Sequence, residues 1–244
     1  MTASLALPIL RQLVPDGFAY GSNLLVEFDP KSIWYETSLT IAADALKAGV
    51  RSDYHTFQHY PDDVLRGLTK LGLDVGGLQS DGTLSIIDSY TVQLGVGTPK
   101  IPKDRVHYQT QSVKLSVWSI YASREMKAGA PEPEKGRLHI DDNTSVLLQY
   151  NDERAVIDFW RTRAIPIARV RNLAFLHSIV IGVYSDAFYR QWESIVDGIV
   201  ELRSEERSSG IEHSIRVRSL RGKNYDSRWH KLKLLENGEV ILVE

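Results

Sequence analysis

Apolar positions along this chain alternate between two spacings. The short apolar run 23–27 is typical of a buried strand. Residues 33–47 follow with apolar side chains three or four positions apart, which predicts a helix that ends at Gly49. The same order recurs downstream: strands are predicted at 52–57, 84–88, 137–141 and 178–184, and helices at 61–71, 112–126, 152–172 (bent at Pro166) and 187–196.

The last fifty residues have a different pattern. Closely spaced strands are predicted at 198–202, 211–218, 229–235 and 240–243, with hairpin turns at 208–210 and 237–238. Glycine and proline mark the segments 95–105 and 129–136 as loops. Strands that alternate with helices favour a parallel, helix-covered sheet, and the terminal hairpins extend it with antiparallel strands. We therefore expect one α/β domain over residues 1–244.

Composition excludes several classes of protein. The chain has 244 residues, 43% hydrophobic and 25% charged, which excludes wholesale disorder. It has no cysteine, so disulfides, thiolate metal sites and cysteine nucleophiles are excluded. A net charge of −2 excludes a protein whose whole surface is basic, but it does not exclude local basic patches. The first ten residues lack a basic region, and no apolar run approaches the ~20 residues of a membrane span, so we expect a cytoplasmic protein.

The connection after the first strand is where a phosphate loop is expected in an α/β fold. Such a loop has the pattern G-x-x-x-x-G-K-[ST], in which backbone N–H groups surround the phosphates. Residues 27–36 contain no glycine. Trp34 stands where the lysine is needed, and Asp29 and Glu36 add negative charge. This connection therefore lacks the groups that bind a nucleotide.

Six segments carry a family resemblance. They are residues 16–22, 82–90, 137–141, 196–202 and 215–222, followed by Arg228-Trp229-His230. In their order and spacing they resemble the KaiC/RadA-type ATPase domains of the RecA superfamily. The resemblance spans essentially the whole chain. It implies a RecA-like P-loop NTPase fold, with a mainly parallel central sheet covered by helices and C-terminal antiparallel hairpins.

The chain departs from this family at the positions that bind and hydrolyse ATP. Aligned on Asp29-Pro30, the glycine positions hold Phe28, Lys31 and Ile33, the lysine position holds Trp34, and the magnesium-binding hydroxyl position holds Tyr35. The acidic pair that activates water is replaced by Gln58-His59. Phosphoryl transfer depends on positioning and electrostatics, so these losses together predict a pseudo-ATPase without cofactor or metal.

Two family positions are retained. Asp141 matches the Walker B aspartate, and Arg221 matches one of a basic pair that reaches the neighbouring subunit's nucleotide, whose lysine is replaced by Ser219. We expect Trp34 and Tyr35 to pack into the space that a nucleotide would occupy, because large aromatic side chains are mostly buried. The alternative is that they form a platform for a base or another ligand.

Several histidines are candidates for chemistry. His55, His59, Asp62 and Asp63 have ligand-type side chains, but their spacing matches no metal motif, so no metal site is predicted. An enzyme built on Asp141, His139 or His59 is the least favoured hypothesis, because the spacing supports no nucleophile–base pair.

The segment 213–233 is basic and contains aromatic residues. Its candidate interaction residues are Arg216, Arg218, Arg221, Lys223, Arg228 and Trp229. Cations interleaved with aromatic rings suit single-stranded nucleic acid, but alternating arginines on a strand also describe a solvated sheet face. The resemblance places subunit contacts here. We therefore expect a catalytically inactive regulatory or scaffold subunit that binds itself or an active KaiC/RadA-type ATPase. The alternative is a single-stranded nucleic-acid-binding accessory of recombination or repair.

Overall fold

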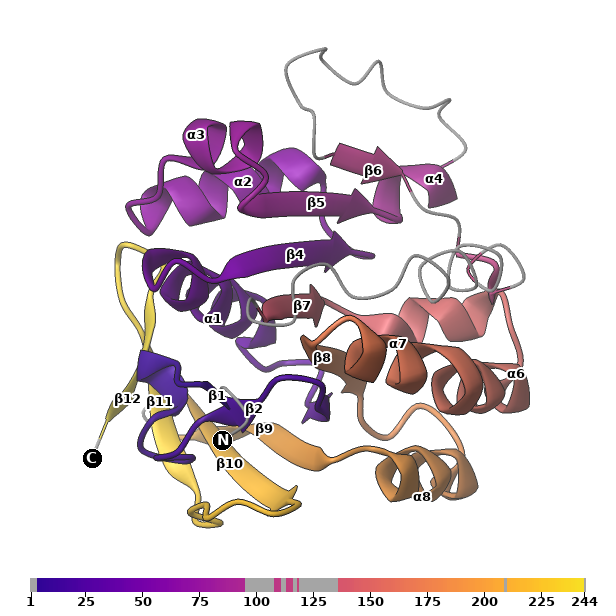
Figure 1. Ribbon diagram of the computed structural model, residues 1–244. Coiled ribbons are helices and arrows are strands. Elements are labelled where there is room, and N and C mark those ends of the chain that lie inside the picture. The colour runs from indigo at the N-terminus through magenta and orange to yellow at the C-terminus, as the bar shows by residue number, and fades with distance from the viewer. Residues whose placement is uncertain are drawn as a thin grey trace.

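A ten-stranded sheet organises the computed structural model, in the order β12-β11-β10-β9-β3-β8-β7-β4-β5-β6 (Figure 1). The structure describes residues 4–94, 108–110, 113–115, 118, 136–208 and 210–243. A second, two-stranded sheet pairs β1 (Ser4–Leu5) with β2 (Phe18–Ala19).

The parallel part of the sheet runs from β9 to β6. Its strands are β3 (Asn23–Phe28), β4 (Arg51–Thr56), β5 (Leu84–Asp88), β6 (Tyr108–Thr110), β7 (Arg137–Asp141), β8 (Leu173–Val180) and β9 (Gly198–Arg207). The antiparallel part continues from β9 through β10 (Gly210–Leu220), β11 (His230–Leu234) and β12 (Val240–Val243). The predicted α/β class, with a mainly parallel sheet and antiparallel C-terminal strands, is confirmed.

Helices cover both faces of the sheet (Figure 1). One face packs mainly against α1 (Trp34–Lys47) and α2 (Pro61–Lys70), with α3 (Val75–Ser80) at the side. The other packs against α6 (Glu153–Phe159), a π-helical turn (Trp160–Ala164), α7 (Ile165–Val170) and α8 (Asp186–Ile195). Short elements complete the described chain: the 3₁₀ turns η1 (Pro8–Leu10) and η2 (Thr144–Gln149), and the single turn α4 (Tyr90–Gln93). Two hydrophobic cores result, one on each face.

Some predicted boundaries were wrong. Strand β8 begins at Leu173, five residues before the expected 178, because Asn172 adopts a φ of 56° that ends the preceding helix and lets the strand start at once. The interruption expected at Pro166 is a π-helical turn that ends two residues before it. The sequence reasoning missed β1, β2, α3 and η2. Most of the predicted helix 112–126 and the loops 95–105 and 129–136 lie outside the described residues.

No helix in the described part of the chain is both long enough and apolar enough to span a bilayer.

Candidate functional site

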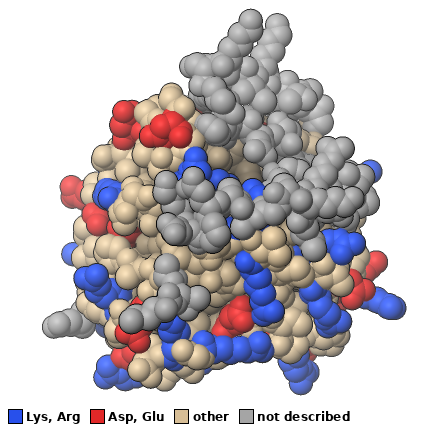
Figure 2. Space-filling view, viewed as in Figure 1, with Lys and Arg blue, Asp and Glu red and all other residues tan. Residues whose placement is uncertain are grey.

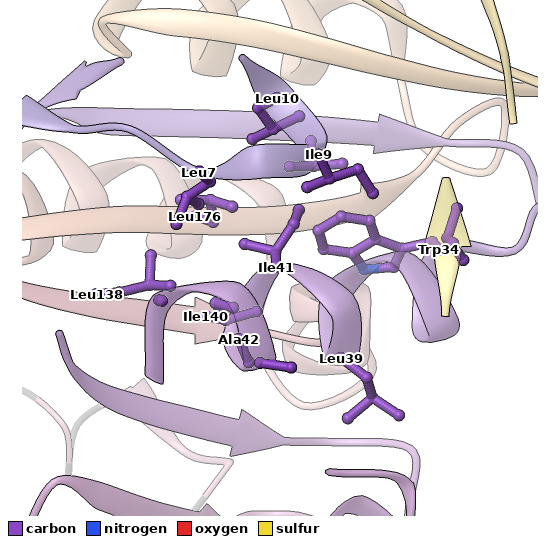
Figure 3. Packing of buried hydrophobic residues seen from close by; sticks show 14 of the residues in the cluster. Leu7, Ile9, Leu10, Trp34, Leu39, Ile41, Ala42, Leu138, Ile140 and Leu176 are labelled. Atoms are coloured by element: carbon purple, nitrogen blue, oxygen red, sulfur yellow. The ribbon is translucent and has the colours of Figure 1, made fainter. Parts of the chain in front are cut away.

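Trp34 fills the junction between β3 and α1. It is the first residue of α1, its side chain is only 3% exposed, and its ring stacks on Phe28 with centroids 6.2 Å apart. The indole Nε1 donates a hydrogen bond to the backbone oxygen of Asp142 at 2.8 Å. Figure 3 shows the ring among the apolar side chains of this core, near Ile9 and Ile41. Trp34 is therefore built into the fold at the position that the resemblance aligns with the family's lysine.

The chain between Phe28 and Trp34 forms a turn with its own hydrogen bonds and one ion pair to β9. Asp29 Oδ1 accepts a hydrogen bond from the Lys31 backbone N–H at 2.9 Å. The Lys31 ammonium lies 2.5 Å from Glu206 Oε1 on β9 in an exposed ion pair. Within the described chain the only non-glycine residue with a positive φ is Asn172, so residues 28–33 lack the glycine conformations that let a phosphate loop wrap its ligand.

Tyr35 lies against His59. Their rings stack with centroids 3.7 Å apart at an interplanar angle of 17°. His59 Nδ1 lies 3.0 Å from Asp142 Oδ2, and Asp142 Oδ1 accepts the Phe57 backbone N–H at 2.7 Å. Burial and the nearby Asp142 carboxylate raise the pKa of Tyr35 above its usual range, so the phenol stays neutral. Tyr35, which the resemblance aligns with the family's magnesium-binding hydroxyl, therefore packs its ring against His59.

Asp141 and Asp142 face opposite sides of the sheet. Side chains alternate along a strand, so consecutive residues at the end of β7 diverge. The Asp142 carboxylate lies beside His59 and the Asp142 backbone oxygen accepts from Trp34, whereas the Asp141 carboxylate lies among histidines on the α6–α8 side. The sequence comparison grouped Asp141 with Trp34 and Tyr35, but the structure brings Asp142 to them instead. The alternation of side chains along a strand was the signal that would have separated Asp141 from Trp34 and Tyr35.

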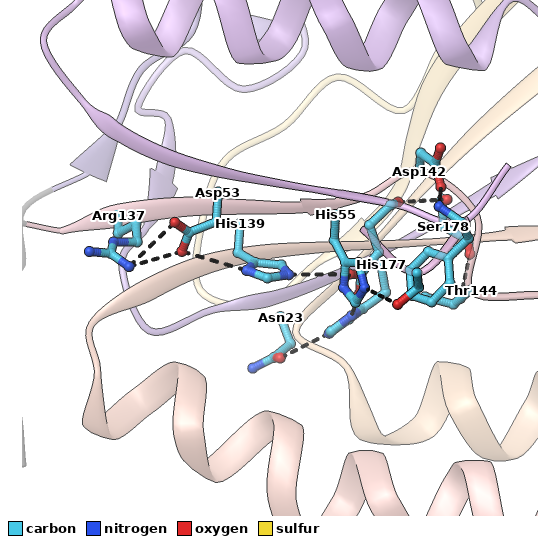
Figure 4. A network of polar contacts seen from close by, with 12 residues as sticks. Asn23, Asp53, His55, Arg137, His139, Asp142, Thr144, His177 and Ser178 are labelled. Carbon is cyan, nitrogen blue, oxygen red and sulfur yellow. Dashed lines mark hydrogen bonds and ion pairs between the residues drawn. The ribbon is translucent and has the colours of Figure 1, made fainter. Parts of the chain in front are cut away.

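Asp141 is the centre of a buried cluster of three histidines, His55, His139 and His177, which are labelled in Figure 4. Its Oδ1 lies 3.1 Å from His55 Nδ1 and 3.2 Å from His139 Nε2. Its Oδ2 lies 3.1 Å from His177 Nδ1. The Asp141 side chain is inaccessible to solvent, and the three imidazoles are at most 12% exposed. One carboxylate therefore contacts three imidazoles inside the core.

Strand register produces this cluster directly from two short sequences. The tripeptide Asp53-Tyr54-His55 on β4 lies beside His139-Ile140-Asp141 on β7, with Asp53 paired to His139 and His55 paired to Asp141. Each acid thus faces an imidazole on the same side of the sheet. The sequence reasoning examined His55 only with its neighbours His59, Asp62 and Asp63. The D-x-H and H-x-D pattern of the two strands was the signal that would have found the cluster.

The cluster is electrostatically balanced. Burial disfavours an imidazolium, yet hydrogen bonds to Asp141 and Asp53 raise the pKa of His139 to about 9. Burial lowers the pKa of both His55 and His177, which stay neutral. Burial alone would raise the pKa of Asp141, but the three imidazoles hold it well below its usual range. With Arg137 lying 3.0 Å from Asp53, two cations offset two carboxylates.

Three of these residues also meet the geometric requirement for metal ligands. His55, His139 and Asp141 each present one ligand atom, and these atoms lie within 4.8 Å of one another. All three are buried. The sequence prediction, which paired His55 with His59, Asp62 and Asp63, did not group these three.

Most arginines of the basic C-terminal segment are paired within the chain. Arg218 lies 3.1 Å from Glu27, 2.6 Å from Glu193 and 2.7 Å from Glu201. Arg216 pairs with Glu201 as well. On the face in Figure 2, red and blue side chains are interspersed rather than separated. These arginines hold β3, β9, β10 and α8 together.

The remaining candidate interaction residues lie around the turn after β10. Arg228 pairs with Asp226 at 2.6 Å. Arg203 and Arg216 lie over the Trp229 ring, at 4.3 and 4.6 Å from its centroid. Arg221 is exposed and donates one hydrogen bond to the Ser194 backbone oxygen at 3.0 Å. Arg221, with Lys223 nearby in the sequence, is thus the most available cation of the predicted set.

Solved structures share this fold. The KaiC-like protein PH0186 from the hyperthermophilic archaeon Pyrococcus horikoshii OT3 has a TM-score of 0.69 at 16% identity, covering 100% of this chain and 99% of that one. The uncharacterized protein PH0321 from Pyrococcus horikoshii, solved in complex with an unknown peptide, has a TM-score of 0.75 at 14% identity, covering 99% of both chains. This likeness shows the KaiC/RecA-type fold. No protein-family model matches the chain, and no curated protein matches its sequence.

Proposed function

We propose that this protein is a catalytically inactive member of the KaiC/RecA-type fold group that acts as a regulatory or scaffold subunit. Trp34 is the observation that carries the proposal. A buried indole, hydrogen-bonded to Asp142, stands at the start of α1 where the phosphate-binding lysine and the nucleotide would meet. Lys31, the one lysine or arginine among residues 27–36, pairs with Glu206, and the same residues contain no glycine.

Loss of the phosphate site leaves protein contacts as the function that the fold supports best. Arg221 is exposed beside the turn at Gly222, and the resemblance assigns this position to contacts with a neighbouring subunit's nucleotide. An arginine supplied in trans stabilises the charge of phosphoryl transfer without needing a nucleotide site of its own. The similar protein PH0321 was solved with an unknown peptide, which supports a binding role for this fold. The partner is a second copy of the chain or an active KaiC/RadA-type ATPase.

The test measures ATP turnover by an active KaiC/RadA-type relative with and without this chain. We expect the chain to bind that relative and to change its turnover, and Arg221→Ala to remove the change while the chain stays folded. The matched control is Arg154→Ala, because Arg154 is 92% exposed and lies on α6, on another element. Unchanged turnover, or an equal loss with both variants, would contradict the proposed regulatory role.

Single-stranded nucleic-acid binding is the second candidate. It is favoured by the cations near Trp229, but Arg216, Arg218 and Arg228 already have acidic partners. Binding through these residues would have to break ion pairs within the chain. The candidate predicts salt-sensitive binding to single strands that is lost on reversing the charges of Arg216, Arg218 and Lys223. Fluorescence anisotropy at low salt that detects no binding would exclude it.

A further inference from the structure

We propose that His55, His139 and Asp141 form a binding site for one divalent first-row transition-metal ion. The site lies between β4 and β7, on the face of the sheet that packs against α6 and α8. Of the residues that the resemblance aligns with a nucleotide site, only Asp141 belongs to it, and Trp34 packs in the core on the other side of the sheet.

The spacing of the three ligand atoms fits a metal. Asp141 Oδ1 lies 3.1 Å from His55 Nδ1 and 3.2 Å from His139 Nε2. Metal–ligand bonds of about 2.0–2.2 Å in a tetrahedral site place neighbouring ligand atoms roughly 3.3 Å apart. All three ligand atoms lie within 4.8 Å of one another, close enough to surround one ion. The separations of the ligand atoms therefore suit one bound metal ion.

The groups behind the ligands give the strongest support. Metal-binding histidines usually place their second nitrogen against an oxygen, and ligating carboxylates are hydrogen-bonded in turn. His55 Nε2 lies 2.8 Å from Ser89 Oγ, a hydroxyl that can donate or accept. His139 Nδ1 lies 3.7 Å from Asp53 Oδ2, and Asp141 Oδ2 lies 3.1 Å from His177 Nδ1. Each ligand thus has a polar group beyond it, and binding of an ion would release to solvent the proton that His139 shares with Asp141.

The outer groups are themselves anchored. Asp53 is fixed by Arg137 at 3.0 Å, and His177 Nε2 lies 3.2 Å from Asn23 Oδ1 on β3. Four adjacent strands therefore hold the arrangement, as Figure 4 shows. A rigid set of ligands on strands keeps its geometry better than one on loops.

The chemistry of the ligands selects the class of ion. Two imidazole nitrogens and one carboxylate oxygen suit Zn²⁺, Fe²⁺, Co²⁺ or Ni²⁺, whereas Mg²⁺ and Ca²⁺ prefer oxygen ligands alone. The ion would join β4 to β7 within the core, which is a structural cross-link of neighbouring strands.

The first test uses the full-length chain, freed of metal by chelator and titrated with Co²⁺ and with Zn²⁺. We expect one ion per chain by elemental analysis and visible Co²⁺ absorption bands that Zn²⁺ abolishes. His55→Gln and Asp141→Asn should each weaken binding at least about 100-fold, and His177→Gln, which keeps the three ligands, by about 10–100-fold. The control His213→Asn alters a histidine on β10 that bonds Ser204, and it should bind like the wild type.

A second measurement needs no variant and so does not depend on any variant folding. The chain has 7 histidines, and Zn²⁺ should shift the imidazole nitrogen NMR signals of His55 and His139 far more than those of His213 and His230. The proposal is overturned if the wild-type chain binds neither ion, if His55→Gln binds as well as wild type, or if the shifted signals belong to other histidines.

Discussion

Replacing Glu27 with glutamine should remove a pH-dependent loss of stability. Glu27 is the fifth residue of β3, is 4% exposed, and faces Arg218 on β10, Glu201 on β9, and Glu193 and Tyr189 on α8. Burial, opposed by Arg218 and reinforced by Glu193, raises the pKa of Glu27 from 4.5 to about 8. Between these two pH values the folded chain holds a proton that the unfolded chain has released, so rising pH destabilises the fold.

The size of the effect follows from the two pKa values. At about 1.36 kcal/mol for each pH unit, a rise from 4.5 to about 8 costs the wild type on the order of 5 kcal/mol. Glutamine has nearly the same shape and no charge, so the variant escapes this cost. We expect the two proteins to have similar free energies of unfolding near pH 5 and the variant to be several kcal/mol more stable near pH 9.

Urea unfolding followed by circular dichroism at a series of pH values measures this difference. The matched control is Glu206→Gln, an exposed glutamate on the neighbouring strand β9 that pairs with Lys31. It should show no gain in stability relative to the wild type as pH rises. If the difference between wild type and Glu27→Gln were the same at every pH, the argument for a buried, protonated Glu27 would be refuted.

Two further substitutions test the packing described above. Trp34→Ala should lower the free energy of unfolding by about 3–5 kcal/mol, because it empties a buried site and leaves the Asp142 carbonyl without its donor; an unchanged urea midpoint would show that the indole is not part of the core. Gly17→Ala should lower the stability of the fold more than Gly72→Ala. Both glycines have a positive φ, but an added Cβ at Gly17 would lie 2.5 Å from the Leu5 backbone oxygen, whereas one at Gly72 would meet no atom within 4 Å. Thermal scans that show equal losses would contradict this difference.

Periodicity was enough to predict the sequence of the main strands and helices, without β1, β2, α3 and η2. The apolar run at β3, the helical spacing of α1 and the turn glycines are local signals, and the structure places these elements close to the predicted residues. The start of β8 was predicted too late because a buried strand and the end of a buried helix have similar apolar composition. The pairing of β1 with β2, fourteen residues later in the chain, has no local signal of comparable strength.

The histidine cluster shows why much of the candidate site could not be predicted residue by residue. His55 and Asp141 are far apart in sequence and meet only because β4 and β7 are neighbours in register. Proximity along the chain instead suggested grouping His55 with His59, although the structure pairs His59 with Asp142. The absence of glycine between Val26 and Glu36, by contrast, needs no tertiary information, and the prediction of a degenerate phosphate loop depends on the sequence alone.

Nucleotide binding tests the central claim most directly. The wild-type chain is titrated with ATP and Mg²⁺ while its melting temperature and heat of binding are recorded. Because the Trp34 indole is buried at the start of α1, Lys31 is paired with Glu206 and residues 27–36 contain no glycine, we expect no rise in melting temperature and no measurable heat. A saturable rise in melting temperature with ATP and Mg²⁺ would contradict the account of an occupied, inactive nucleotide site.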